Sequence, residues 1–399
     1  MKHACAWIVA TLFVTMTASA QTQPLSLGAA IELALENDIR LLSGKAALQL
    51  AQIQQKCPSV WEDPEARFET ALNSDENELR SALRLYFPHP WRLKAASHER
   101  AAITGEAEAE HLMAATVTAS EVYWTYREFQ CLEKEILLAN RLTEIQQVLA
   151  TLSDKQVKAG MQTSGQALLL HWELREAKRT ARTLCGERAV LKNRLASLTG
   201  LESETLEIPV LEFPEIFSAP DAVSDIARRP DLMLRQAQLQ QASAQVKLAQ
   251  SEGIPWFNHV QTGYSDRDNE WGIQVALSIP VFSLRSAEKR AAFAEQSLWQ
   301  AVVGAAEKSA KAQMHEALAA FNAAAAEWTV HREEQRELAN ATHKEIEKLK
   351  EFAPSAPGEW LKLEERLVEA ERDLLKTLEI VYSARANLLF ASGQTSIQE

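Results

Sequence analysis

The chain has 399 residues, only 13 glycines and 13 prolines, and a formal net charge of −12 at pH 7. Long unbroken runs of Ala, Leu, Glu, Gln and Lys beside so few Gly and Pro indicate long helices rather than a compact α/β enzyme. The acidic charge argues against nucleic acid as a partner, because phosphate binding needs a basic surface.

The N-terminal stretch MKHACAWIVATLFVTMTASA has the pattern of a secretory signal peptide. Lys2 precedes an apolar stretch, and Ala18-Ser19-Ala20 forms a small-residue cleavage site. The alternative, a membrane anchor, would need roughly 20 apolar residues, more than this stretch provides. Residues 1–20 are therefore expected to be a signal peptide. No later run of about 18 apolar residues predicts a transmembrane helix, so any membrane-embedded part would consist of strands.

The remaining sequence contains an internal repeat. Pro64 matches Pro255 at an offset of 191 residues, and Gly200 matches Gly393 at 193. Further pairs in the same order are Leu48 with Leu239, Pro88 with Pro280, and Gly165 with Gly358. One such pair could arise by chance, but an ordered series along most of the chain favours a duplication.

The repeat predicts a first unit at residues 21–200 and a second unit of the same order at 221–399. Residues 201–220 are expected to be a linker, since Pro209 and Pro214 stop helix continuation there. Both units are expected to form one structural body.

Each unit is expected to contain a helix, two strands and a long helical hairpin. In the first unit the expected helix lies at 26–57, the strands at 65–72 and 79–87, and the hairpin helices at 91–158 and 163–199. In the second unit the helix lies at 221–252 with a break near Pro230, the strands at 257–264 and 271–279, and the hairpin helices at 284–351 and 358–391. The predicted fold class is mainly α with a small β part.

The hairpin helices carry coiled-coil spacing. Leu138, Leu142, Ile145, Leu149 and Leu152 recur at alternating steps of four and three residues. A helix of about 65 residues is roughly 100 Å long at 1.5 Å per residue. No compact domain needs a rod of that length, so length and repetition favour long coiled-coil hairpins over ordinary core helices.

The second and fourth strands alternate between apolar and polar residues, which predicts a sheet with one apolar and one polar face. Such a sheet can cover a soluble core, or it can face lipid on one side and water on the other. Export, aromatic residues beside the strands and the absence of a globular core favour the membrane. The residues expected to face lipid are Leu83, Leu85, Phe87, Ile273, Val275, Leu277 and Ile279, whereas Gln274 and Ser278 should face a water-filled lumen.

Four strands per chain are too few for a closed barrel, since spanning barrels have at least about eight. Two chains would supply eight strands and three chains twelve. An intermolecular barrel is therefore expected. The first strand is the weakest, because Phe68 and Leu72 are its only large apolar residues.

Several longer stretches resemble the TolC family of outer membrane efflux proteins. They are LSLGAAIELALENDIRLLSGKAALQLAQ, RRPDLMLRQAQLQQASAQVKLAQSEGIPWF, AGMQTSGQALLLHWELREAKRTA and the terminal LTG and ASG. With the repeat, the resemblance covers essentially the whole chain after the signal peptide. It implies a homotrimer whose twelve-stranded β-barrel continues into an α-helical periplasmic tunnel.

The resemblance also implies the function: an exit duct of a tripartite efflux or type I export system in the cell outer membrane, with its helical part in the periplasm. The implied partners are a periplasmic adaptor (membrane fusion) protein, an inner membrane transporter of the RND or ABC type, and outer membrane lipid. The chain departs from the family at Asn37-Asp38-Ile39, where Asn-Pro is common, and at the two prolines of EFAPSAPGEW. The alternative is a periplasmic coiled-coil adaptor or scaffold without a pore.

No catalytic constellation stands out. HExxH, a Gly-rich phosphate loop and G-x-S-x-G are all missing from the sequence. We therefore expect neither an enzyme nor a cofactor or metal site, and a second alternative, a secreted enzyme, has no supporting residues.

Acidic residues near the two hairpin turns could line a periplasmic aperture. The candidates are Asp154, Glu347, Glu351 and Glu359. Rings of symmetry-related carboxylates would attract cations. The alternative is that they are ordinary surface acids.

Two cysteines could pair across the first hairpin. If antiparallel helices fold about a tip near residue 158, Cys131 and Cys185 lie at the same level. A disulfide is then possible in an oxidising periplasm. Two unbonded thiols at one level are the alternative.

Overall fold

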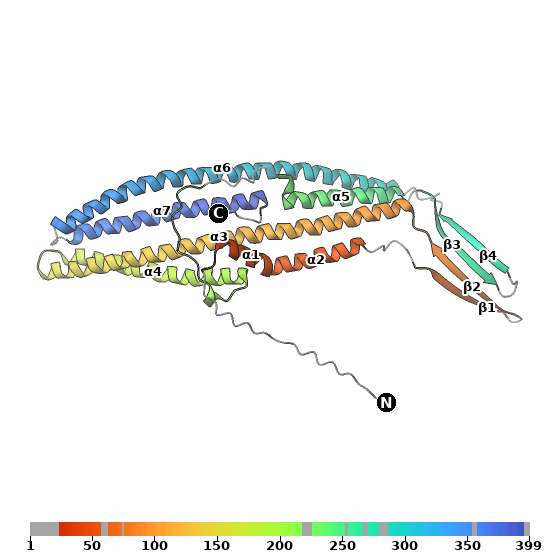
Figure 1. The fold of residues 1–399 in the computed structure, drawn as a ribbon, viewed down its shortest axis with the longest axis horizontal. Helices are drawn as coiled ribbons and strands as arrows, with labels where there is room; N and C mark the ends of the chain where they lie inside the picture. The colour runs from red at the N-terminus through yellow and green to blue at the C-terminus, as the bar shows by residue number, and fades with distance from the viewer. Residues whose placement is uncertain are drawn as a thin grey trace, which may run out of the picture.

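The computed structural model describes residues 24–56, 63–73, 76–217, 226–251, 254–265, 270–278, 286–352 and 357–394. The expected signal peptide lies outside these residues. Long helices run side by side along the molecule, and a small sheet lies at one end (Figure 1). Within the described ranges, no helix has both the length and the apolar character required to cross a membrane.

The elements occur in the same order in the two halves of the chain. The first half contains α1 Leu27–Asn37, α2 Ile39–Lys56, β1 Glu65–Asn73, β2 Glu76–Tyr86, α3 Pro90–Lys158 and α4 Ser164–Thr199. After the short η1 (Ser203–Thr205), the second half contains η3 Ile226–Arg228, α5 Pro230–Ser251, β3 Trp256–Ser265, β4 Glu270–Ser278, α6 Ser286–Phe352 and α7 Pro357–Ser392. These bounds lie within a few residues of those predicted from the sequence.

The helix expected at 26–57 is interrupted at Asp38. This residue adopts an extended conformation, with φ −64° and ψ 124°. Its carboxylate accepts a hydrogen bond from the backbone N–H of Arg40 at 2.8 Å, which satisfies a free donor at the start of α2. The break therefore comes from a polar cap that hydrophobic periodicity alone could not reveal.

Two glycines end helices in equivalent places of the two halves. Gly200 follows α4 with φ +73°, and Gly393 follows α7 with φ +72°. Glycine adopts this left-handed conformation without the steric cost that a Cβ brings, and it commonly ends helices in this way.

The two hairpins, α3–α4 and α6–α7, have their turns at the end opposite the sheet (Figure 1). On α3, Leu138, Ile145 and Leu149 are buried in a cluster with Leu361 and Val368 of α7. The heptad positions predicted from the sequence therefore form the seam between the two hairpins.

A larger apolar core lies where α1, α3, α6 and α7 meet. Its fully buried side chains include Tyr123 of α3, Trp328 of α6 and Leu378 of α7. The predicted linker takes part in this core, because Leu206 and Leu211 are buried in it. Residues 201–217 therefore form a strap across the long helices, and not only a connection between units.

Hydrogen bonds fix the strap to the helices beneath it. The amide nitrogen of Gln130 on α3 donates to the carbonyl of Pro209 at 2.9 Å. The indole N–H of Trp328 on α6 donates to the carbonyl of Pro214 at 3.3 Å. The strap thus satisfies buried polar groups of both hairpins.

Candidate functional site: the two faces of the sheet

The four antiparallel strands, in the order β1-β2-β3-β4, align side chains in rows across the sheet. Leu83 of β2 lies opposite Ala66 and Thr262, and Thr262 lies opposite Ile273. The next row consists of Glu65, Arg84, Gln261 and Gln274. Because successive side chains point to opposite faces of a sheet, the two rows belong to opposite faces.

One face is apolar and exposed. The residues predicted to face lipid, apart from Ile279, lie exposed on it; they are Leu83, Leu85, Phe87, Ile273, Val275 and Leu277. Phe68 and Trp271 extend this surface, and Ile273 is 77 % exposed. Ile279 and the side chain of Ser278 lie outside the described part of the chain. A continuous apolar surface of this kind marks a site that contacts lipid or protein.

The opposite face carries a network of polar side chains. Arg84 donates to the amide oxygen of Gln261 from Nε at 3.1 Å and from Nη2 at 2.9 Å. Tyr86 donates to Glu65 at 2.9 Å, and Glu65 also forms an ion pair with Arg67 at 3.1 Å. These bonds link β1, β2 and β3 side by side and hold the polar groups in fixed positions.

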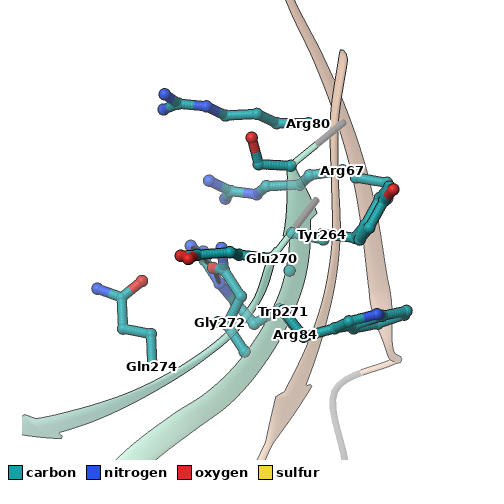
Figure 2. A pocket seen from close by; sticks show the side chains of 13 residues that line it. Arg67, Arg80, Arg84, Tyr264, Glu270, Trp271, Gly272 and Gln274 are labelled. Carbon is teal, nitrogen blue, oxygen red and sulfur yellow. Dashed lines mark hydrogen bonds between the residues drawn. The ribbon is translucent and has the colours of Figure 1, made fainter. Parts of the chain in front are cut away.

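Small residues open a hollow in this polar face. Arg67 is aligned with Ala82, Gly263 and Gly272, which have little or no side chain. The resulting hollow measures about 410 Å³. Figure 2 shows Arg67, Arg80, Glu270 and Gln274 extending to the same side, whereas the rings of Tyr264 and Trp271 lie on the other. The sequence predicted Gln274 for this face, and the alternation of Arg80 and Arg84 with the apolar residues of the second strand places them on the same side; Arg67 of β1 was not singled out.

The predicted aperture residues lie at the far end of the helical hairpins. Asp154 contacts Nε2 of His171 on α4 at 3.0 Å. Glu347, Glu351 and Glu359 are exposed near the turn between α6 and α7. In one chain they are surface acids, and a carboxylate ring would need further copies of the chain.

Of the two possibilities left open for Cys131 and Cys185, a disulfide or two unbonded thiols, the structure shows the second. Both thiols are free, with Cys131 buried and Cys185 exposed. The levels were predicted correctly, because their neighbours Leu132 and Leu184 pack in one cluster between α3 and α4. Cys131 itself belongs to the central core. Successive side chains on a helix differ in direction by about 100°, so Cys131 and its neighbour Leu132 face different sides of α3.

No protein-family model and no curated protein matches the sequence. Solved structures do match the fold. CusC, described by its conformational changes on folding and transmembrane channel formation, has 17 % identity and a TM-score of 0.75, with 95 % of each chain covered.

Two further structures match in the same way. The outer membrane protein VceC of Vibrio cholerae has 19 % identity and a TM-score of 0.73, covering 92 % of this chain and 96 % of its own. The outer membrane channel MtrE of Neisseria gonorrhoeae has 17 % identity and a TM-score of 0.72, covering 92 % and 89 %. Along nearly its whole length, the chain has the fold of these TolC-family outer membrane channels.

Proposed function

We propose that the protein is the outer membrane channel of a tripartite efflux or type I export system, a passive duct and not an enzyme. The observation that carries this proposal is the sheet at the end of the helical rods. One of its faces is exposed and apolar, and the other bears an ordered set of charged and amide side chains. Such a sheet suits lipid outside and a water-filled lumen inside.

The strand edges support assembly with further copies. β1 and β4 end the sheet and have no neighbouring strand on their outer sides within the described residues. Unpaired backbone groups cannot remain in a lipid environment, because each one costs several kcal/mol. Pairing of β4 with β1 of the next copy would satisfy both edges and close the ring.

The helices support the same arrangement. α2 and β1 lie along one long side of the molecule, and α6 and β4 along the other (Figure 1). Ile39 and Ile53 of α2 are exposed apolar residues, as are Phe293 and Leu298 of α6. A copy placed against one side would therefore cover α2 and pair with β1 together, a head-to-tail contact of the kind that forms closed rings.

Three copies give the twelve strands that the family resemblance implies, so we propose a homotrimer. The helical part would then extend into the periplasm. At its tip, Met161, Leu168 and Trp172 are exposed, which leaves apolar surface for a periplasmic adaptor protein connected to an RND or ABC transporter. Glu351 and Glu359 would lie near the aperture of this tunnel, where three copies would bring their charges close together.

Single-channel recording tests the proposed function. Purified full-length protein added to a planar lipid bilayer should produce stepwise conductance increases that persist without ATP. A periplasmic adaptor or scaffold without a pore, the main alternative, would leave the bilayer unchanged.

A further inference from the structure

A second polar hollow lies far from the sheet, in a groove between α3, α4 and α7. The groove measures about 230 Å³. Carboxylates of Glu173 and Glu176 line it from α4 and that of Glu365 from α7, while Ala139 and Leu142 of α3 form an apolar floor. Arg372 of α7 also lines the groove. With three carboxylates against one guanidinium, the groove is acidic, and it adjoins a surface that suits a hydrocarbon chain.

Gln146 of α3 also lines this groove and is only 3 % exposed. Its amide nitrogen donates to the Glu365 carboxylate at 2.6 Å. This contact fixes the orientation of the Gln146 amide. If the amide were turned over, its carbonyl oxygen would lie against the Glu365 carboxylate, and the two acceptors would repel each other. The other end, Oε1, is buried and has no hydrogen-bond partner among the described residues. A buried acceptor without a donor is costly, which makes a donor from outside the chain favourable here.

Two of the carboxylates in the groove have no ion-pair partner within the described residues. Across the described residues, neither Glu173 nor Glu365 forms an ion pair, whereas Arg372 pairs with Glu135 at 2.8 Å. Burial raises the pKa of Glu365, and the nearby charges of Glu369 and Glu173 raise it further, while the charge of Arg366 and the hydrogen bond from Gln146 oppose the rise. A positive charge between Glu173 and Glu365 would relieve this repulsion.

We propose that the groove binds an organic cation with a primary ammonium group, such as a linear polyamine. The ammonium group would donate to Gln146 Oε1 and to the carboxylates of Glu173 and Glu365. Its methylene groups would lie on Ala139 and Leu142. This apolar floor favours an alkylammonium ion over a hydrated metal ion, because only the alkylammonium ion has methylene groups that gain from apolar contact. The site is separate from the sheet, so its occupancy does not depend on conduction.

Isothermal titration of the full-length protein in detergent with spermidine tests the site. Three variants change it one group at a time: Glu173→Gln, Glu365→Gln and Gln146→Leu. Each should raise the Kd for spermidine about tenfold, since each removes one charge-assisted or buried hydrogen bond. The matched control, Glu187→Gln, removes the same charge from an exposed position of α4 outside the groove and should leave the Kd within twofold.

Two results would overturn the proposal. The first is a Kd for spermidine in the Glu173→Gln variant that stays within twofold of the value for the unaltered protein. Spermidine would then bind through the overall negative charge of the protein and not in this groove. The other is displacement of spermidine by an equal concentration of Mg²⁺, which would identify a site without preference for ammonium. Thermal unfolding checks that the variants fold. If Glu365→Gln does not fold, the exposed Glu173 still carries the test.

Discussion

The carboxylate of Asp38 and the guanidinium of Arg229 occupy equivalent positions in the two halves of the chain, separated by the 191-residue offset of the repeat and opposite in charge. Both side chains are buried, at 6 % and 5 % exposure. Asp38 pairs with Arg40 at 2.8 Å, and Arg229 pairs with Asp231 at 2.8 Å. The same ion pair is thus present twice with its charges exchanged.

Each buried member also anchors its short helix to a long one. Asp38 accepts a hydrogen bond from Thr118 of α3 at 2.7 Å, and Arg229 donates to the carbonyl of Ala310 of α6 at 3.1 Å. The pairs therefore fix where α2 and α5 begin against the hairpins.

Replacement of Asp38 should destabilise the protein. Hydrogen bonds from Arg40 and Thr118 outweigh burial and lower the pKa of Asp38 from 3.8 to about 2. Its stabilising effect is therefore present above pH 3.8 and is lost as pH falls toward 2. Asp38→Asn should lower the free energy of unfolding by about 1–3 kcal/mol at pH 7, measured by thermal or denaturant unfolding.

Asp231→Asn is the matched control for this change. It removes the exposed member of the second pair, so its effect should be smaller, even though Arg229 loses one partner. An equal loss in both variants would show that burial of the carboxylate is not the cause.

Glu379 should make stability depend on pH in the opposite direction. Burial, together with the carboxylates of Glu135 and Glu128, raises its pKa from 4.5 to about 7, while Lys376 opposes the shift. The folded protein therefore favours the protonated form, and stability should fall as pH rises from 4.5 through 7. Glu379→Gln should raise the unfolding temperature at pH 8 and leave it nearly unchanged at pH 4.

The exposed acid Asp373 of the same helix provides a comparison. Asp373→Asn should alter the unfolding temperature little at either pH. If Glu379→Gln behaves in the same way, the pH dependence originates elsewhere.

Adjacent residues of β4 should tolerate the same charge differently. Ile273 lies on the apolar face and Gln274 on the polar face. Ile273→Arg should reduce membrane-inserted protein, since an arginine facing lipid near the middle of a bilayer costs about 2–4 kcal/mol. Gln274→Arg should insert normally. Both variants can be compared by fractionation of the outer membrane, and equal insertion would contradict the assignment of the faces.

The cysteines should label according to the structure. In folded protein Cys185 should react with a thiol reagent and Cys131 should not. After unfolding without reductant, all three cysteines, Cys57, Cys131 and Cys185, should react. Mass spectrometry counts the labels on each chain. If Cys131 and Cys185 both stay unlabelled after unfolding, the two cysteines form a disulfide and the structure is contradicted at this point.

Much of the fold follows from local sequence patterns. Periodicity located the long helices and strands, and prolines such as Pro90 and Pro230 lie at helix starts, where their fixed φ is favourable. The strap was missed as a structural element because Leu206 and Leu211 show no helical or strand period. The sequence left the bonding of Cys131 open for a similar reason, because matching levels along a hairpin do not determine which way a side chain faces.

The ammonium groove lay beyond sequence reasoning for a different reason. Gln146, Glu173 and Glu365 lie on three helices, and the last is 219 residues from the first. Only the packing of the two hairpins brings them together. The polar face of the sheet was partly predictable, since its alternation is local, but the pairing of Arg84 with Gln261 depends on the contact between β2 and β3.

The central claim, that the polar face of the sheet lines a conducting pore, is tested most directly by thiol modification during single-channel recording. Cys57, Cys131 and Cys185 would first be replaced by serine, and Gln274→Cys or Val275→Cys added. A charged, water-soluble thiol reagent should change the conductance of the Gln274→Cys channel and leave that of the Val275→Cys channel unaltered. The same response in both channels, or no channel at all from the parent protein, would contradict the claim.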